Sequence, residues 1–111
     1  MGSRGFLGEF EQMVLLAILQ QGDEAFALEV RREIEDSTGQ KVSRGAFYTT
    51  LDRLQRKGLV SWKESEPDDS RRRGALRKYR VSPAGLHALR GSREAVDRLS
   101  RGLDHVLGRL S

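Results

Sequence analysis

The segment VSRGAFYTTLDRLQRKGLV, residues 42–60, constrains the fold of this chain more than any other stretch. Ser43 can accept hydrogen bonds from the unpaired amide protons of a first helical turn, and Gly58 can end the helix. At about 100° per residue, the apolar positions form a single stripe that consists of Phe47, Leu51 and Leu54. These signals predict a helix over residues 43–57 that buries one face.

The opposite face of this helix is polar, and two of its members are not needed on a purely solvated surface. Gly45 lowers helix stability in the first turn but lets another molecule approach the backbone closely. Tyr48 carries a large ring on the shoulder of the same face. The other members are Arg44, Thr49, Asp52, Arg53 and Arg56. Arginines alone are typical of any charged surface, so the glycine and the tyrosine are what indicate a contact with another molecule.

Two helices are expected before this one. The first covers residues 8–21, and its apolar side chains surround nearly the whole cylinder. Such a helix either contacts both its own core and a second subunit or lies entirely within one core, and the sequence leaves both open. The second is predicted over residues 25–38, before a stop at Gly39; its inward-facing residues include Phe26, Val30 and Ile34. Residues 40–42 could add a stub of strand.

Two strands are predicted after the helix over residues 43–57. The first covers residues 59–65, where Val60 and Trp62 are the large apolar members. The second covers residues 76–81, where apolar and basic side chains alternate with the period of a half-buried strand. The stretch between them, EPDDSRRRGA at residues 66–75, is a loop by composition. The pair therefore forms a β-hairpin with a basic tip, which holds Arg71, Arg72 and Arg73.

The C-terminal part of the chain predicts one long helix. Ser82 and Pro83 are a strong helix start, and the helix is expected to run to Leu110. Its apolar residues follow the three- and four-residue spacings of a coiled-coil seam, but the run is too short to be stable alone, and its internal glycines each cost about 1 kcal/mol. We therefore expect this helix to pack against a second subunit. The expected dimer contacts are Phe10, Val14, Leu89, Val96, Leu99, Leu103, Val106 and Leu110.

Composition excludes several classes of function. The 111 residues include no cysteine, so a disulfide, a thiolate nucleophile and a zinc–thiolate site are excluded. The two histidines, His87 and His105, have no partners that complete a catalytic or metal site, and no glycine-rich phosphate loop is present. We expect neither an enzyme nor a cofactor. The longest apolar run is too short to cross a bilayer, and no signal peptide is evident, so we expect a cytoplasmic protein.

The order of the predicted elements is that of a winged helix-turn-helix. In such a module the second helix of the pair lies in the major groove, and the hairpin reaches phosphates or the minor groove. The net charge of +4 is a weak additional indication of nucleic acid. The expected fold is mainly α with a small β-hairpin. It comprises a winged helix-turn-helix DNA-binding domain over residues 1–82 and a C-terminal dimerisation helix over residues 83–111.

Over nearly its whole length the chain resembles the PadR-type transcriptional regulators. The matching pieces are GEFEQMVLLAILQQGDEAFALEVRREIEDSTG, VSRGAFYTTLDRLQRKGLV and KYRVSPAGLHALR. The resemblance implies that the helix over residues 43–57 recognises DNA, that Tyr48 lies on its DNA side, and that residues 59–81 form the wing. It also implies a homodimer that binds roughly palindromic DNA operators, most often as a repressor.

The chain also departs from the pattern of this family. Phe26 and Ala27 stand where members commonly have tyrosine and glycine, a mild change that keeps the packing. The wing sequence DDSRRRGALRKY is richer in arginine than in similar members. Some members bind aromatic drugs through tryptophans between the helices of the dimer. The single tryptophan here, Trp62, is predicted in a wing strand, which argues against aromatic drugs and leaves a small-molecule effector of another kind open.

The residues expected to contact DNA are Ser43, Arg44, Gly45, Tyr48, Thr49, Arg53, Arg56, Arg71, Arg72, Arg73 and Lys78. Asp52 would repel phosphate, so we expect it either to pair with Arg56 one turn later or to accept a hydrogen bond from a cytosine. Two other classes of function share this fold. One is a winged helix that binds proteins without specific DNA binding, and the other is a nucleic-acid binder without sequence preference.

Overall fold

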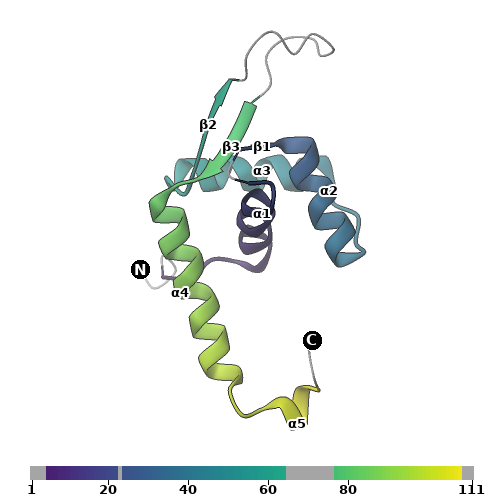
Figure 1. The fold of residues 1–111 in the computed structure, drawn as a ribbon, viewed down its shortest axis with the longest axis vertical. Coiled ribbons are helices and arrows are strands. Elements are labelled where there is room, and N and C mark those ends of the chain that lie inside the picture. Colours follow the sequence, from purple (N-terminus) through teal and green to yellow (C-terminus); the bar gives the residue numbers. More distant parts are fainter. Residues whose placement is uncertain (1–4, 23, 65–76, 109–111) are drawn as a thin grey trace.

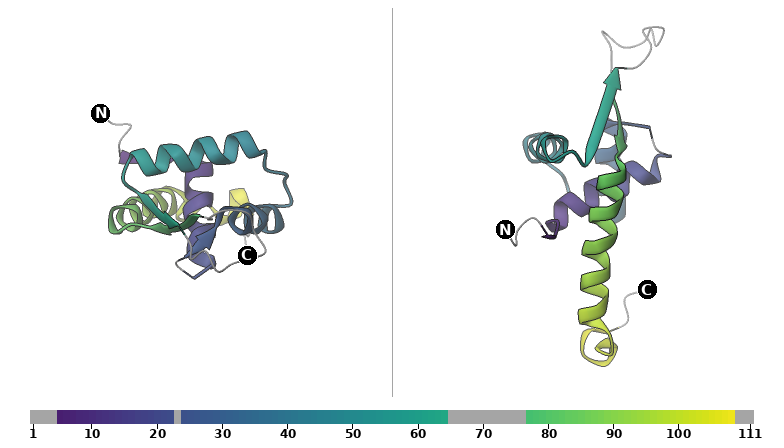
Figure 2. Two further views of the ribbon diagram at one scale, coloured as in Figure 1. Left: turned by 90° about the horizontal axis from the view of Figure 1, so that it is seen from above. Right: turned by 90° about the vertical axis from the view of Figure 1, so that its left-hand side faces the viewer.

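The computed structural model describes residues 5–22, 24–64 and 77–108 and is mainly helical with a small sheet, as the sequence predicts (Figure 1). In chain order the elements are α1 (Glu9–Gln20), β1 (Ala25–Phe26), α2 (Ala27–Thr38), α3 (Arg44–Arg56), β2 (Val60–Glu64), β3 (Arg77–Val81), α4 (Pro83–Ser100) and α5 (Asp104–Leu107). Helix α3 and the β2–β3 pair lie toward one end of the molecule, and α4 leads away from them to α5 (Figure 2). The predicted loop tip at residues 66–75 lies outside the described residues.

The sheet has three antiparallel strands in the order β1–β3–β2, which is one strand more than predicted. Ala25 and Phe26 pair with Tyr79 and Lys78 of β3, so α2 begins at Ala27 and not at Ala25. Phe26 has an extended backbone, at φ −85° and ψ 144°. The early helix start was wrong because the pairing partner of these two residues lies far away in the sequence.

The expected stub of strand at residues 40–42 was also wrong. These residues connect α2 to α3, and no strand is formed there. The backbone N–H of Val42 donates instead to the carboxylate of Glu35 at 2.7 Å. Gly39 ends α2 as predicted, with a left-handed backbone at φ +71°. The Glu35 side chain of the preceding helix therefore accepts a backbone hydrogen bond that a strand partner would otherwise accept.

The core forms where α1 meets α2, α3, α4 and β3. Val14, Leu15 and Ile18 of α1 are fully buried, which places this helix at the centre of the domain. The stripe predicted on α3 is confirmed, because its three apolar side chains, Phe47, Leu51 and Leu54, are at most 2% exposed. Thr50, beside the stripe, is also buried. Burial of this one face fixes which side of α3 points away from the protein.

Helix α4 begins as predicted but ends early. The Ser82 hydroxyl accepts the N–H of Gly85 at 3.0 Å, and Pro83 is the first helical residue. The expected continuous helix to Leu110 was wrong, because α4 stops at Ser100 and the short α5 follows. Gly102 separates the two helices with a left-handed backbone at φ +80°, a conformation that favours glycine. Leu110 lies outside the described residues.

Candidate nucleic-acid interface

Helix α3 presents its polar face to the outside because its N-terminus and its apolar stripe are both held by the protein. The Ser43 hydroxyl accepts the N–H of Ala46 at 3.1 Å, as expected for an N-cap. The exposed residues on the outward face and its shoulder are Arg44, Gly45, Tyr48, Thr49, Asp52 and Arg56. A backbone stretch around Gly45 is open, since a Cβ built there would contact nothing within 4 Å. The structure therefore brings most of the predicted α3 site onto one accessible surface.

Tyr48 is held in place at the shoulder of this surface. Its ring packs edge-on against the buried Phe47 ring, with a centroid separation of 5.3 Å. The guanidinium of Arg44 lies 5.9 Å from the centroid of the Tyr48 ring, within the range of a cation–π contact. These contacts reduce the freedom of two exposed side chains, which lowers the entropy that they would lose on binding a partner.

Asp52 pairs with Arg56, which is one of the two roles expected for it. The Arg56 Nη2 atom lies 3.0 Å from Asp52 Oδ2, one helical turn away. Both side chains remain well exposed, so the pair contributes little stability. The pair partly neutralises the negative charge of Asp52 on this face of α3.

Arg53 lies on the flank of α3 that faces α1. Its Nη1 atom is 3.8 Å from Oε2 of Glu11, and the same carboxylate oxygen accepts a hydrogen bond from Lys57 Nζ at 2.9 Å. The Glu11 side chain is only 8% exposed. Neither Glu11 nor Lys57 was predicted as part of the site. The available signal was a pair of carboxylates, Glu9 and Glu11, in the first turn of a largely apolar helix.

The base of the wing carries a second group of charges. The Nζ atoms of Lys63 and Lys78 each lie 3.5 Å from a carboxylate oxygen of Glu24. The charges of Lys63 and, next, Lys78 lower the pKa of the exposed Glu24 carboxyl. Lys78, which was predicted to contact DNA, is therefore paired within the protein. The other predicted wing residues, Arg71, Arg72 and Arg73, lie outside the described residues.

An arginine–tryptophan stack at the wing was not predicted. The guanidinium carbon of Arg77, the first residue of β3, lies 3.8 Å from the centroid of the Trp62 ring on β2. Trp62 and Tyr79 are direct partners in the sheet register, so the stack adjoins the core. The alternation of basic and apolar residues predicts the strand, but the contact depends on the register between the two strands.

The residues expected at a dimer interface fall into two groups. Val14 and Leu89 are 0% and 5% exposed, so within this protomer they have no side-chain surface left for a partner. Val96, Leu99, Leu103 and Val106 are 60%, 81%, 40% and 67% exposed. Phe10 is half-buried. Among the predicted interface residues that the structure describes, the exposed ones thus lie on the second half of α4, just before α5 and on α5.

The described residues contain no cluster of three or more histidine or acidic side chains that could hold a metal ion. His87 and His105 are both exposed. Among the helices that the structure describes, none is long and apolar enough to cross a bilayer.

Comparisons with solved structures agree on the fold. A PadR-like transcriptional regulator from Bacillus cereus superposes with a TM-score of 0.72 at 21% identity, over 91% of this chain and 93% of that chain. F93 from STIV, a winged-helix DNA-binding protein, superposes with a TM-score of 0.70 at 15% identity, over 87% and 97%. The chain thus has a winged-helix fold.

Sequence comparison identifies the family. Transcriptional regulator Rv3488 of Mycobacterium tuberculosis is 40% identical over 74 residues, which are 63% of this chain and 65% of that relative's length. The model of the Transcriptional regulator PadR-like family matches residues 15–91, which include α3, β2, β3 and the start of α4. The chain belongs to the PadR-like family of transcriptional regulators, whose members are transcription factors and not enzymes.

Proposed function

We propose that this protein is a homodimeric repressor that binds a roughly palindromic operator. Helix α3 enters the major groove, and the wing at residues 66–75 contacts the backbone or the minor groove. The observation that carries the proposal is the outward face of α3, where Arg44, Gly45 and Thr49 are exposed opposite a fully buried stripe. A helix of this kind presents side chains of suitable length to base edges and phosphates.

The proposed dimer rests on an apolar face of α4 that continues beyond the domain. Gly85, Leu89 and Ser92 are buried against the domain in the first half of α4. At about 100° per residue, Val96 and Leu99 lie on nearly the same side of the helix, but both are strongly exposed. A second copy of the chain supplies a complementary apolar surface, because a two-fold interface uses the same patch twice.

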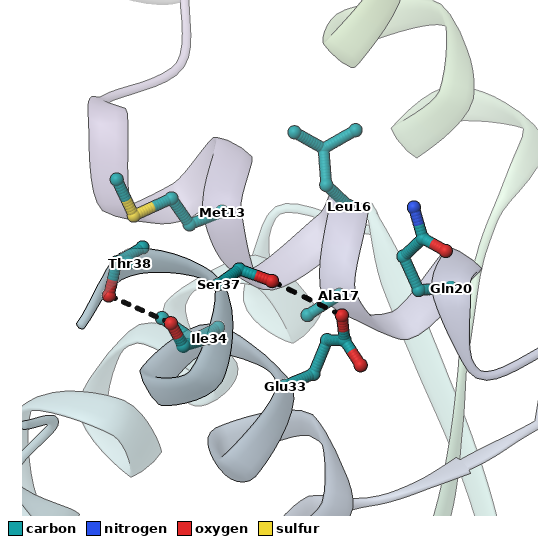
Figure 3. Close-up of a pocket in the computed structure, with 8 residues that line it drawn as sticks. All are labelled: Met13, Leu16, Ala17, Gln20, Glu33, Ile34, Ser37 and Thr38. Carbon is teal, nitrogen blue, oxygen red and sulfur yellow. Dashed lines mark hydrogen bonds between the residues drawn. The ribbon is translucent and has the colours of Figure 1, made fainter. Parts of the chain in front are cut away.

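A groove between α1 and α2 offers a further apolar surface for the second copy (Figure 3). It has a volume of about 210 Å³, and its apolar walls come from Met13, Leu16, Ala17 and Ile34. Its polar rim includes Ser37 and Thr38, whose hydroxyls donate within α2 to Glu33 Oε2 and the Ile34 carbonyl. The exposed leucines and valines of a partner's α4 and α5 match this lining chemically. Two-fold symmetry would then present two copies of α3 to inverted half-sites about 34 Å apart.

The experiment that tests this function is selection of duplexes from a random pool, followed by titration at several salt concentrations. We expect an inverted-repeat consensus, binding of the selected duplex at least about 10³-fold tighter than a scrambled duplex, and a steep loss of affinity with salt. A reporter gene with the selected operator at its promoter should be less active when the protein is present. Equal binding of selected and scrambled duplexes would contradict the proposal and favour a binder without sequence preference. No binding to either would favour a protein-interaction module.

A further inference from the structure

We propose that Glu11 is a positioning residue for DNA specificity, because it anchors the C-terminal end of α3 and links that end to α4. This inference rests on the proposed role of α3 in DNA recognition. Glu11 itself is buried, so its effect on DNA would be transmitted through other side chains.

The anchor is one carboxylate shared between the start of α1 and the end of α3. Oε1 of Glu11 accepts the backbone N–H of Gly8 at 2.9 Å. Oε2 accepts a hydrogen bond from Lys57 Nζ at 2.9 Å and lies 3.8 Å from Arg53 Nη1. A buried carboxylate needs such partners, since an unpaired charge in a low-dielectric environment is strongly unfavourable. The two cations therefore hold the last turn of α3 against α1.

The charge state of Glu11 is consistent with this role. Burial raises the pKa of the carboxyl, but the hydrogen bonds from Lys57 and Gly8 and the charges of Lys57 and Arg53 together outweigh it. The net shift is downward, so the carboxylate is ionised at neutral pH. A neutral group at this position would form an ion pair with neither Arg53 nor Lys57.

The link to α4 runs through the residues just before α1. The backbone N–H of Leu7 donates to Ser92 Oγ at 2.9 Å, and Ser92 is only 2% exposed. Gln12 Nε2 donates to the Leu7 carbonyl at 3.1 Å, which fixes this segment on α1 as well. The exposed apolar stripe of α4 starts at Val96, one turn after Ser92. Residues 7–12 thus connect the helix proposed to dimerise with the helix proposed to read DNA.

The consequence for specificity follows from where the two cations lie. The side chains of Arg53 and Lys57 are 46% and 44% exposed, so both could reach a phosphate if Glu11 released them. Phosphate contacts strengthen binding to every sequence, whereas base contacts depend on the placement of α3. Loss of the anchor would therefore favour binding without sequence preference over specific binding.

The test compares Glu11→Gln with two matched variants of the full chain. Glu11→Asp keeps the buried charge, and Glu9→Gln makes the same charge change at an exposed position in the same turn. For Glu11→Gln we expect scrambled duplex to bind about three- to tenfold tighter, with a log–log salt slope steeper by about one to two. The ratio of selected to scrambled affinity should fall about tenfold. In Glu11→Asp and Glu9→Gln the ratio should stay within about twofold of the wild type and the slope should be unchanged.

An unchanged ratio and salt slope in Glu11→Gln, with only lower stability, would overturn the inference and leave Glu11 a purely structural residue. If Glu11→Gln does not fold, Lys57→Met replaces it, because this substitution removes a cation from a half-exposed position while keeping a similar shape. It should lower the ratio without tightening the binding of scrambled duplex. An unchanged ratio in this variant would likewise overturn the inference.

Amide hydrogen exchange in the DNA-free protein separates this inference from the proposed function. The N–H groups of Lys57 and Gly58 donate to the carbonyls of Arg53 and Gln55, both at 3.0 Å, and Leu7 donates to Ser92. In Glu11→Gln these amides should exchange at least about fivefold faster than in Glu9→Gln, because the anchor holds both the last turn of α3 and the segment before α1. Equal exchange rates would contradict the anchor, whatever the wild type does with DNA. A wild type without sequence preference, together with faster exchange in Glu11→Gln, would reject the proposed function and the effect of Glu11 on specificity, but would retain the anchor of α3 by Glu11.

Discussion

Gly85 lies where α4 approaches the backbone between α3 and β2. A Cβ atom there would collide with the carbonyl oxygen of Leu59 and lie 2.8 Å from Val81 Cγ1. Gly85→Ala should therefore destabilise the fold by about 1–3 kcal/mol, although alanine is the better helix former by about 1 kcal/mol. Gly91→Ala is the matched control, because a Cβ at Gly91 has no neighbour within 4 Å and should stabilise α4. Urea unfolding measures both effects, and the same sign for both variants would refute this account.

Thr49 and Thr50 are adjacent threonines with opposite surroundings. Thr49 is exposed on the outward face of α3, whereas Thr50 is 5% exposed within the domain. Thr49→Ala should relax the preference at particular base pairs by about 1–3 kcal/mol, measured with a panel of singly substituted operator duplexes. Thr50→Ala should lower the free energy of unfolding and leave the base preference unchanged. If Thr49→Ala changes neither affinity nor preference, the recognition face has been placed wrongly.

Glu11 also predicts a specific pH dependence of stability. Its pKa is lowered in the folded protein, so the carboxylate contributes stability above its unfolded-state pKa. This contribution disappears as the pH falls below 4.5 and through the lower folded-state pKa. The stability difference between wild type and Glu11→Gln should be constant near neutral pH and shrink in that acidic range. Urea unfolding at a series of pH values measures it, with Glu9→Gln as a parallel control; a difference that stays constant into acid would contradict the prediction.

At the scale of elements, we expect the break between α4 and α5 to depend on Gly102. An alanine in this left-handed conformation costs about 1–2 kcal/mol, whereas a continuous helix avoids that strain. Gly102→Ala should therefore join α4 to α5 and make the circular dichroism at 222 nm more negative. Gly91→Ala should change this signal little, because residue 91 is already helical. Equal signals in wild type and Gly102→Ala would show that other residues impose the break.

At the scale of the whole molecule, the chain is more extended than a compact domain of its length. Its radius of gyration is 15.7 Å, against about 13 Å for a compact chain of this size. The direction of α4 in Figure 1 accounts for the difference, because this helix runs away from the sheet and ends far from it. The exposed apolar stripe on this projecting helix is the surface on which the proposed dimer rests.

Leu99→Arg should therefore weaken the proposed dimer, because it places a charge in the middle of the apolar stripe. Leu99 is 81% exposed in the protomer, so the substitution does not disturb the fold of the domain. We expect the dimer dissociation constant to rise at least about tenfold, measured by sedimentation equilibrium. Leu86→Arg makes the same chemical change at an exposed leucine near the start of α4 and should leave the dimer intact. Equal effects of the two variants would place the interface elsewhere.

The elements that could be predicted from the sequence are those specified by neighbouring residues. The serine caps at Ser43 and Ser82 and the apolar spacing of α3 act within a few turns, and the structure confirms α3 and the start of α4. The orientation of α3 follows from the same local pattern, because only one face can enter the core. The pairing of Asp52 with Arg56 is likewise local, although the sequence alone left a second role open.

Long-range contacts decided the rest. Strand β1 exists because Ala25 meets Tyr79, and the Glu11 anchor exists because the fold brings Lys57 beside a residue 46 positions earlier. Both depend on tertiary geometry, which local propensity does not contain. Gly102 is exposed and follows the end of α4 at Ser100, so no packing offsets the cost of a glycine in a helix there. The sequence thus determined the helix proposed to read DNA, and the tertiary structure decided what anchors that helix, because anchoring requires groups from distant parts of the chain.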